Sequence, residues 1–337
     1  MDKKIRWGVL GAANIAVKKV IPAMQSGAFS EVAAIASRSL EKAKRAAADL
    51  NIPRFYGSYE ELLADTEIDA IYNPLPNDLH VEWTTKAAEA GKHVLCEKPL
   101  AMSAKEARKL IEVRDRTGVK IQEAFMVRTH PQWLAVRDLI AQNRIGALRA
   151  VTMFFSYFNN DAGNIRNKIE NGGGALMDIG CYCVNLPRFI IGAEPRRVAA
   201  LIERDETSGI DKLTSAIMDF PNCQSTFTCS TQLAPYQRVQ FFGAKGRLEV
   251  EIPVNIPTAA ATRIYIDDGA DLYGANIEII EIPAANQYTI QGDAFSKAIL
   301  EDTEQPISLE DSIKNMAVIE AVFRAAESGK WESVEVA

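Results

Sequence analysis

The triplet Glu97-Lys98-Pro99 brings together residue types that suit proton transfer. It follows an apolar run at residues 93–96 that predicts a buried strand, and ligands of open α/β sheets bind at the carboxyl ends of such strands. A lysine that loses hydration beside a bound cofactor has a lowered pKa, so it can exchange a proton with a substrate hydroxyl near neutral pH. We therefore expect Lys98 to be catalytic, with an exposed lysine at a strand end as the alternative.

A variant of the dinucleotide-binding fingerprint lies near the N-terminus. Gly11 and Ala16 match two of its small-residue positions, whereas Ala13 stands where the second glycine is usual. The turn is expected to present backbone amides, including those of Asn14 and Ile15, to a pyrophosphate at the start of a helix. The methyl group of Ala13 would move the phosphate slightly outward without abolishing this cradle. Because the turn follows a strand and opens a helix, dinucleotide binding is favoured over a purely structural corner.

The end of the second predicted strand indicates which dinucleotide is bound. An acidic side chain there usually accepts a hydrogen bond from the ribose of NAD, whereas this chain has Ser37-Arg38-Ser39. Arg38 can pair with a 2′-phosphate, and the serines can donate hydrogen bonds to it. NADP is therefore predicted as the cofactor, with NAD as the alternative. A solvated arginine on a surface loop is the competing interpretation.

Strands and helices alternate through the first part of the chain. The predicted strands are residues 5–10, 31–36, 70–73, 93–96 and 121–124. Helical patterns separate them, and one of these helices, after Ser39, begins with a capping residue. The alternation predicts an α/β Rossmann domain over residues 1–122, with a doubly wound parallel sheet that positions the dinucleotide turn and Lys98.

The remainder, residues 123–337, has a different rhythm. The predicted strands are residues 148–157, 198–203, 212–220, 225–231, 239–243 and 247–251. Turn residues rather than helices separate most of them, which predicts an α+β domain with a large, mostly antiparallel open sheet. Two helices, 288–301 and 309–328, end the chain, and the last is a candidate to pack back on the first domain. This domain is expected to bind substrate and to mediate oligomerisation.

The composition narrows the classes of function. With 337 residues, 47% of them hydrophobic and 24% charged, the chain is typical of a globular protein with room for two domains. A net charge of −6 argues against a nucleic-acid or membrane partner. Five cysteines and three histidines lack the spacing of a disulfide framework or metal site, so reduced thiols and no metal are expected. Neither a signal peptide nor an apolar stretch approaching a membrane span is recognised, so the protein is expected in the cytoplasm.

Three ordered motifs resemble the Gfo/Idh/MocA family, named for glucose-fructose oxidoreductase and inositol dehydrogenase. Glu97-Lys98-Pro99 is similar to its hallmark, residues 73–80 to its nicotinamide-side loop, and the glycine-rich residues 172–185 to its second signature. The resemblance covers nearly the whole chain. It implies that the cofactor is contacted by Pro74, Leu75, Asn77, His80, Glu97 and Lys98.

Tyr182 departs from part of that family. Inositol-dehydrogenase-like members have histidine at this position, and the tyrosine form is similar to the subgroup of glucose-fructose oxidoreductase, dihydrodiol dehydrogenases and NADP-dependent D-xylose dehydrogenases. A phenol can donate to the substrate oxygen while Lys98 holds its pKa down, which makes a proton relay. Tyr182 is therefore predicted to be catalytic, with Asp178 orienting the lysine or binding a hydroxyl. A buried structural tyrosine is the alternative.

The resemblance also implies a substrate class. Arg128 and Arg166 are weaker candidates to grip substrate, since loop arginines are more often surface charges. The expected activity is hydride transfer between NADP and a carbinol carbon of a sugar or cyclic polyol or diol. An NAD-dependent glycosidase that uses transient oxidation and a non-catalytic dinucleotide-binding sensor remain as alternatives. A homodimer or larger homo-oligomer through the C-terminal sheet is expected.

Overall fold

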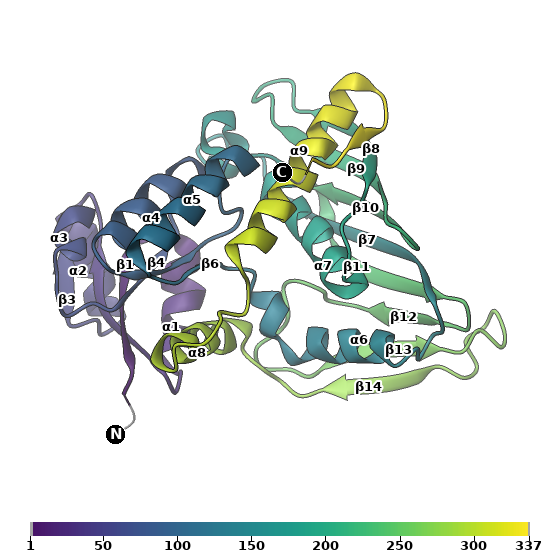
Figure 1. Cartoon of the computed structure of the whole chain (residues 1–337), viewed down its shortest axis with the longest axis horizontal. Coiled ribbons are helices and arrows are strands. Elements are labelled where there is room, and N and C mark those ends of the chain that lie inside the picture. The colour runs from purple at the N-terminus through teal and green to yellow at the C-terminus, as the bar shows by residue number, and fades with distance from the viewer. Residues whose placement is uncertain (1–2, 336–337) are drawn as a thin grey trace. The chain divides into compact units, whose positions relative to one another are not determined.

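The computed structural model describes residues 3–335, which form two compact units (Figure 1). The first unit contains the chain up to Thr129 and the segment Asn286–Ile313, and the second contains His130–Ala285 and the chain from Lys314 onward. Relative to the division expected at residue 122, the first unit ends later and includes one of the two C-terminal helices. The functions assigned to the two domains stay predictions.

A parallel sheet forms the centre of the first unit. Over the described residues it has six strands in the order β3-β2-β1-β4-β5-β6, all paired in parallel. The strands are β1 (Ile5–Leu10), β2 (Ser30–Ala36), β3 (Arg54–Tyr56), β4 (Ala70–Asn73), β5 (His93–Cys96) and β6 (Ile121–Glu123). The order reverses between β1 and β4, which is where open α/β sheets bind ligands. The predicted parallel sheet is confirmed, and β3 adds to it.

These strands are connected by η1 (Ala16–Val20), α1 (Ile21–Gln25), α2 (Leu40–Asp49), α3 (Tyr59–Leu63), η2 (Asn77–Leu79), α4 (His80–Glu89) and α5 (Ala104–Thr117). The unit also contains η3 (Met126–Thr129), which follows β6, and α8 (Gln287–Leu300), which comes from much later in the chain. The helix predicted from Ala16 starts as a π-helical turn, and Pro22 lies in the first turn of α1, where proline is tolerated. The predicted cap is confirmed, because the Ser39 side chain accepts a hydrogen bond from the backbone N–H of Lys42. In Figure 1, α4 lies beside α5 and α1 beside α8.

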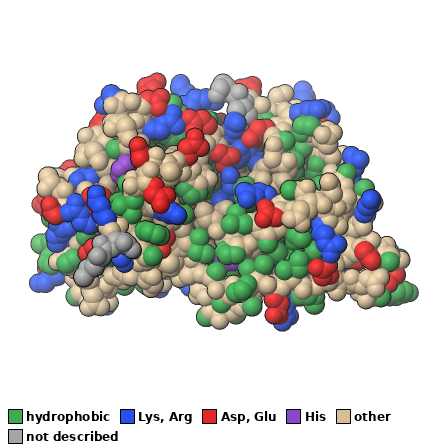
Figure 2. All heavy atoms as spheres, turned by 60° about the horizontal axis from the view of Figure 1, so that its bottom comes forward, with side chains coloured by type: hydrophobic (Ala, Val, Ile, Leu, Met, Phe, Trp, Pro, Cys, Tyr) green, Lys and Arg blue, Asp and Glu red, His purple; other side chains and the backbone are tan. Residues whose placement is uncertain are grey.

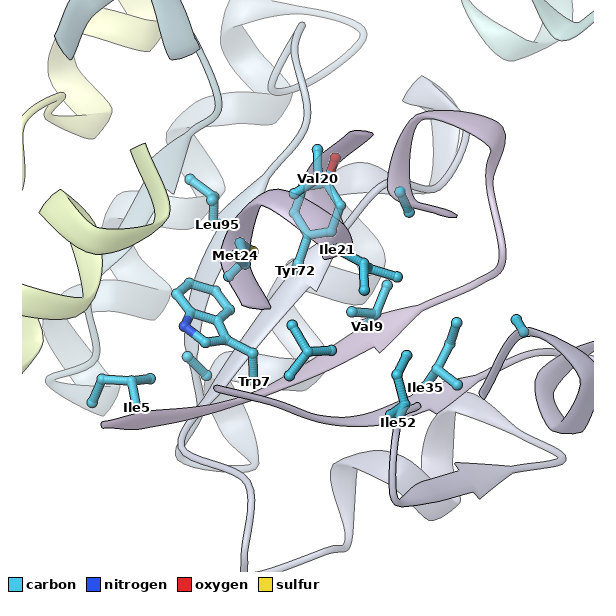
Figure 3. Close-up of a cluster of buried hydrophobic side chains, with 14 of the residues drawn as sticks. Ile5, Trp7, Val9, Val20, Ile21, Met24, Ile35, Ile52, Tyr72 and Leu95 are labelled. Atoms are coloured by element: carbon cyan, nitrogen blue, oxygen red, sulfur yellow. The ribbon is translucent and has the colours of Figure 1, made fainter. Parts of the chain in front are cut away.

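Buried side chains from β1, β2, β4 and α8 form the hydrophobic core of this unit (Figure 3). Trp7 is fully buried, and its ring centroid lies 5.9 Å from that of Phe295. Its indole Nε1 donates a 3.0 Å hydrogen bond to Ser296 Oγ. Helix α8, although distant in sequence, therefore packs against the first strand of the sheet.

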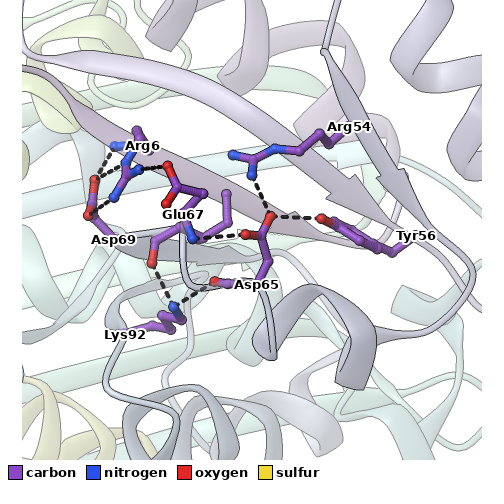
Figure 4. Close-up of polar contacts among 8 residues, drawn as sticks. Arg6, Arg54, Tyr56, Asp65, Glu67, Asp69 and Lys92 are labelled. Atoms are coloured by element: carbon purple, nitrogen blue, oxygen red, sulfur yellow. Dashed lines mark hydrogen bonds and ion pairs between the residues drawn. The ribbon is translucent and has the colours of Figure 1, made fainter.

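A polar network joins the amino ends of the strands (Figure 4). Arg6, at the start of β1, donates to both carboxylate oxygens of Asp69, which directly precedes β4. Lys92, directly before β5, donates to the backbone oxygens of Asp65 and Ile68. The Asp65 carboxylate pairs with Arg54 of β3 at 2.7 Å. These contacts join the amino ends of the strands and so stabilise the sheet. They lie at the opposite edge from the carboxyl ends, where open α/β sheets bind ligands.

The second unit is built on a large mixed sheet. Over the described residues it has nine strands in the order β14-β13-β12-β11-β7-β10-β9-β8-β15, and only the β7–β10 pair is parallel. The strands are β7 (Leu148–Phe158), β8 (Arg197–Arg204), β9 (Asp211–Asp219), β10 (Gln224–Ser230), β11 (Gln232–Gly243), β12 (Arg247–Val250), β13 (Thr262–Asp267), β14 (Glu278–Ile282) and β15 (Glu332–Ser333). The predicted mostly antiparallel sheet is confirmed, and β13, β14 and β15 extend it.

One face of this sheet is covered by helices. They are α6 (Pro131–Ala141), the π-helical segment η6 (Leu176–Gly180) and α7 (Cys181–Ile191), which contact strands β7, β9, β10 and β13. The part of α9 (Leu309–Ser328) from Lys314 onward also belongs to this unit. The segment Ile169–Ile191, which contains η6 and α7, reaches the length and apolar composition of a membrane span, which corrects the expectation that no segment approaches one. Of its 18 most apolar consecutive residues, 89% are buried inside the protein, which is typical of a core helix.

Candidate functional site

The glycine turn after β1 has the geometry of a close-approach site. Gly11 has a φ of +86°, which favours glycine, and its N–H donates a 2.7 Å hydrogen bond to Ala36 O. A Cβ at this position would lie 3.2 Å from Leu75 Cδ2 and 3.5 Å from Tyr59 Oη. A side chain at this position would therefore be strained and would press on Leu75, in the loop after β4, and on Tyr59, at the start of α3. Ala12, Ala13 and Ile15 are half-buried and Asn14 is exposed.

The predicted 2′-phosphate site contains a tyrosine that the sequence did not indicate. Arg38 is exposed, whereas Ser37 is buried and accepts a 3.3 Å hydrogen bond from the backbone N–H of Ser39. Burial raises the pKa of Tyr59, against the opposing charge of Arg38 and the hydrogen bond that Arg38 donates to its hydroxyl. The Tyr59 ring packs edge-on against Trp83, with centroids 4.8 Å apart. Tyr59 thus lies between the glycine turn and Arg38.

The loop after β4 is organised by two buried polar side chains. Asn73 Oδ1 accepts from the backbone N–H of Leu75 at 3.3 Å, and its Nδ2 donates to His80 O and Thr84 Oγ1, both at 3.2 Å. The His80 ring lies 2.7 Å from Leu75 O through Nε2 and 2.7 Å from Pro99 O through Nδ1. The ring therefore ties the predicted nicotinamide-side loop to the turn that holds Lys98.

His80 is fully buried, although the sequence suggested direct contact with the cofactor. Burial lowers its pKa to about 4, with the two carbonyl acceptors opposing the shift and the Lys98 charge adding to it. The ring is thus neutral near pH 7 and donates one N–H to one carbonyl at a time. The ring joins the two loops from inside the unit, and contact of His80 with the cofactor stays a prediction.

Lys98 lies on a turn that is anchored on both sides. Glu97 Oε1 accepts a 2.6 Å hydrogen bond from Tyr72 Oη, and its Oε2 accepts a 3.3 Å bond from the backbone N–H of Lys98. On the other side, Glu123 Oε1 accepts a 2.8 Å bond from the backbone N–H of Leu100. Lys98 is half-buried at the carboxyl end of β5. Tyr72 and Glu123 were missed from the sequence, because their role depends on pairing between strands.

A second polar cluster lies in the second unit around Asp178. Its Oδ2 accepts a 2.5 Å hydrogen bond from Tyr157 Oη, and its Oδ1 accepts a 3.1 Å bond from Arg166 Nε. Burial, followed by the Asp178 charge, raises the pKa of Tyr157, so this phenol stays a donor. The structure thus brings together two predicted residues, Asp178 and Arg166, with a tyrosine at the end of β7 that no sequence signal marked.

Tyr182 lies four residues after Asp178 on the same helical stretch, so both project from one side of it. The side chain is 4% exposed, and its ring centroid is 6.3 Å from that of Phe155. Lys98 belongs to the first unit and Tyr182 to the second. The proton relay between them therefore stays a prediction.

The remaining predicted site residue is Arg128. Arg128 is only 12% exposed and pairs with Asp311 at 2.8 Å within the first unit, which is a structural contact that the sequence did not predict. The five cysteines are buried free thiols, as predicted. Acidic and basic side chains are interspersed over the face shown in Figure 2, without a field of one sign.

Comparison with known proteins gives matches along most of the chain. The family model of the oxidoreductase family with an NAD-binding Rossmann fold matches residues 5–125, and that of the GFO/IDH/MocA C-terminal domain matches residues 133–249. An uncharacterized oxidoreductase of Rhizobium meliloti is 47% identical over 98% of this chain and 99% of its own length. A D-xylose 1-dehydrogenase (NADP(+)) of Haloferax volcanii is 38% identical over 96% and 98%. The crystal structure of a 3-ketoreductase from Actinomadura kijaniata with NADP and TDP-benzene has a TM-score of 0.89 at 30% identity, covering 96% of this chain and 98% of that one.

Proposed function

Because the chain belongs to the GFO/IDH/MocA oxidoreductase family, we propose that it transfers a hydride between NADP and a carbinol carbon of a sugar or cyclic polyol or diol. The observation that carries the proposal is the anchored Lys98 turn, which the buried His80 ties to the loop that closes over Gly11. The D-xylose dehydrogenase among the relatives supports a sugar, and its NADP supports the dinucleotide. The cofactor, when bound, supplies the hydride chemistry.

The first unit has residues that fit a dinucleotide. The φ of +86° at Gly11 favours glycine, and the turn that it forms can bring the backbone from Gly11 through Ala13, Asn14 and Ile15 close to a pyrophosphate. Ser37 and Arg38 would hold a 2′-phosphate, with Tyr59 keeping the guanidinium in place. On the nicotinamide side, the candidates are Pro74, Leu75, Asn77 and Glu97, with His80 as a support.

The proton that accompanies hydride transfer is assigned to Lys98 and Tyr182. In the oxidative direction, the substrate hydroxyl would donate its proton to one of these side chains as the hydride leaves the carbon. Asp178 would fix the position of the helix that carries Tyr182, because its two carboxylate oxygens accept hydrogen bonds from Tyr157 and Arg166. Arg166 is 42% exposed and would add a hydrogen bond to a substrate hydroxyl.

The proposed function is tested by absorbance at the reduced-nicotinamide band. Purified protein would be mixed with NADP or NAD and a panel of aldoses, inositols and cyclic diols. A rise with NADP and one substrate class would support the proposal. Tight dinucleotide binding without a signal from any pair would favour the sensor, and release of a leaving group from a glycoside without net reduction would favour the glycosidase.

Arg38→Ala is expected to lower the preference for NADP over NAD by at least about tenfold, because a charge-assisted hydrogen bond to a 2′-phosphate contributes about 1.5–3 kcal/mol. The measurement is kcat/KM with each dinucleotide. Arg45→Ala, on the next helix and with a side chain 86% exposed, is the matched control and should leave the ratio unchanged. An unchanged ratio in Arg38→Ala would remove Arg38 from the cofactor site.

The open face of the second sheet is proposed as the self-association surface. A groove on this face is lined by residues of β7 to β10, including Leu201, which is 79% exposed, and Ile217, which is 42% exposed. Apolar patches of this kind usually mark interaction sites, and a two-fold contact would bring each patch onto its copy.

Leu201→Glu is therefore expected to convert a homo-oligomer into monomers at micromolar concentration, because it places unpaired charges in an apolar contact. Sedimentation velocity measures the change. Leu272→Glu, at a side chain that is 98% exposed and outside the groove, should have no effect. A monomeric wild type would rule this surface out as a stable interface.

A further inference from the structure

The helical stretch that carries Asp178 and Tyr182 begins at a residue that cannot cap it. Gly174 O accepts the first helical hydrogen bond, from the backbone N–H of Asp178 at 3.0 Å. Gly174 is therefore the N-cap residue, where a polar side chain usually satisfies one of the free N–H groups. Its lack of a side chain leaves the group to be satisfied from elsewhere in the fold.

Asp211, the first residue of β9, supplies the missing cap. Its Oδ2 accepts a 2.7 Å hydrogen bond from the backbone N–H of Leu176 and a 2.9 Å bond from Thr214 Oγ1. The residue is 2% exposed. A Cβ on Gly174 would lie 1.9 Å from Asp211 Oδ1. The glycine is thus required by the carboxylate that caps its helix.

Gly173 and Gly174 also pack against the backbone of Arg166. A Cβ on Gly173 would lie 2.5 Å from Arg166 O, and the N–H of Gly174 donates to that oxygen at 2.9 Å. Arg166 in turn donates to Asp178. The cap, the glycine run and the Arg166 loop therefore form one packed unit around the start of the helix.

We propose that Asp211 is a positioning residue of the active site, which holds the start of the Asp178–Tyr182 helix and the Arg166 loop in place through the acceptor oxygen of its side chain. The proposal rests on the proposed function for its effect on turnover. Its effect on the fold does not depend on that function.

The charge of Asp211 has a separate, measurable consequence. Burial raises its pKa to about 6, while the hydrogen bonds from Leu176 and Thr214 and the charge of Arg204 oppose the shift. The neighbouring Cys229 thiol stays neutral, because burial raises its pKa. Since the folded-state pKa lies above the ordinary value of 3.8, the folded state binds this proton more tightly. The stability that this proton provides is fully present below about pH 4 and is lost as the pH rises through about 6.

Asp211→Ala should lower kcat about tenfold, because small displacements of catalytic groups slow the chemical step, while the dissociation constant of NADP stays within about twofold. Asp211→Asn keeps the acceptor oxygen and should stay within about twofold of the wild-type kcat. Wild-type kcat in Asp211→Ala, or equal losses in both variants, would overturn the proposal. If Asp211→Ala does not fold, Thr214→Val takes its place, with an expected loss of about threefold that corresponds to one hydrogen bond; an unchanged kcat in Thr214→Val would then overturn it.

Chemical denaturation from pH 4 to 8 gives a readout that does not need turnover. The unfolding midpoint of Asp211→Asn should rise relative to wild type as the pH increases through about 6. The control is Asp219→Asn at the other end of β9, a residue in a surface ion pair with Arg197, which should match wild type in kcat and in pH dependence. If wild type shows no turnover but Asp211→Ala unfolds at a lower denaturant concentration than Asp211→Asn, the proposed function fails and the cap stands. Equal unfolding midpoints for Asp211→Ala and Asp211→Asn would overturn the cap.

Discussion

Replacing Lys98 with methionine is expected to lower kcat by about 10²–10⁴-fold, which is the usual contribution of a positioned acid or base. Methionine has similar length but cannot carry a proton, so the reaction loses its transfer partner. The dissociation constant of NADP should change by less than about threefold, because the carboxylates of Glu97 and Glu123 hold the backbone of this turn. Steady-state turnover and fluorescence titration of the dinucleotide measure the two quantities.

Lys86→Met is the matched control for this experiment. Lys86 is on α4 in the same unit, and its side chain is 41% exposed and paired with Glu82 on the same helix. It should leave both kcat and NADP affinity unchanged. A fully active Lys98→Met enzyme would eliminate the proposed relay and would move the search for the proton acceptor to the second unit.

Replacing Trp7 with alanine is expected to lower the free energy of unfolding by about 3–5 kcal/mol, the usual range for large aromatic side chains in a core. The ring is fully buried against Phe295, and its removal would also leave Ser296 Oγ without its indole donor. Because these partners lie on α8, the variant tests whether this late helix stabilises the first unit. Denaturant unfolding measures the change from the midpoint and slope.

Trp331→Ala is the control for Trp7→Ala. Trp331 is 45% exposed and stacks with Arg197 at 4.6 Å, so its removal should change the free energy of unfolding by less than about 0.5 kcal/mol. Equal, small losses in both variants would show that α8 contributes little to the first unit. If Trp7→Ala lost dinucleotide binding and Trp331→Ala did not, this core would be shown to support the glycine turn after β1.

Local patterns were enough to predict much of the scaffold. The strands at Ile5–Leu10, Ala70–Asn73 and His93–Cys96 coincide with the predicted runs, and Ser39 caps its helix as expected. These features depend on side-chain period and on hydrogen bonds between close neighbours in the chain, both of which are visible in sequence. Membership of the family was predicted for the same reason, because its motifs are short and continuous.

Tertiary contacts decided the environment of the candidate site. Tyr59 at the glycine turn, Tyr72 against Glu97 and Tyr157 against Asp178 each join segments that are far apart in sequence. His80 was placed at the cofactor by its motif, but both of its ring nitrogens face backbone carbonyls inside the unit. No local signal distinguishes a buried partner of this kind from an exposed side chain.

The sequence by itself determined the residue types that suit proton transfer and dinucleotide binding, and the order of the elements that carry them. Only the tertiary structure decided which side chains hold those residues, as Asp211 shows by capping a helix that starts with Gly174. The physical reason is that hydrogen bonds and close packing act at distances of about 3–4 Å, which depend on how distant segments fold together rather than on their separation along the chain.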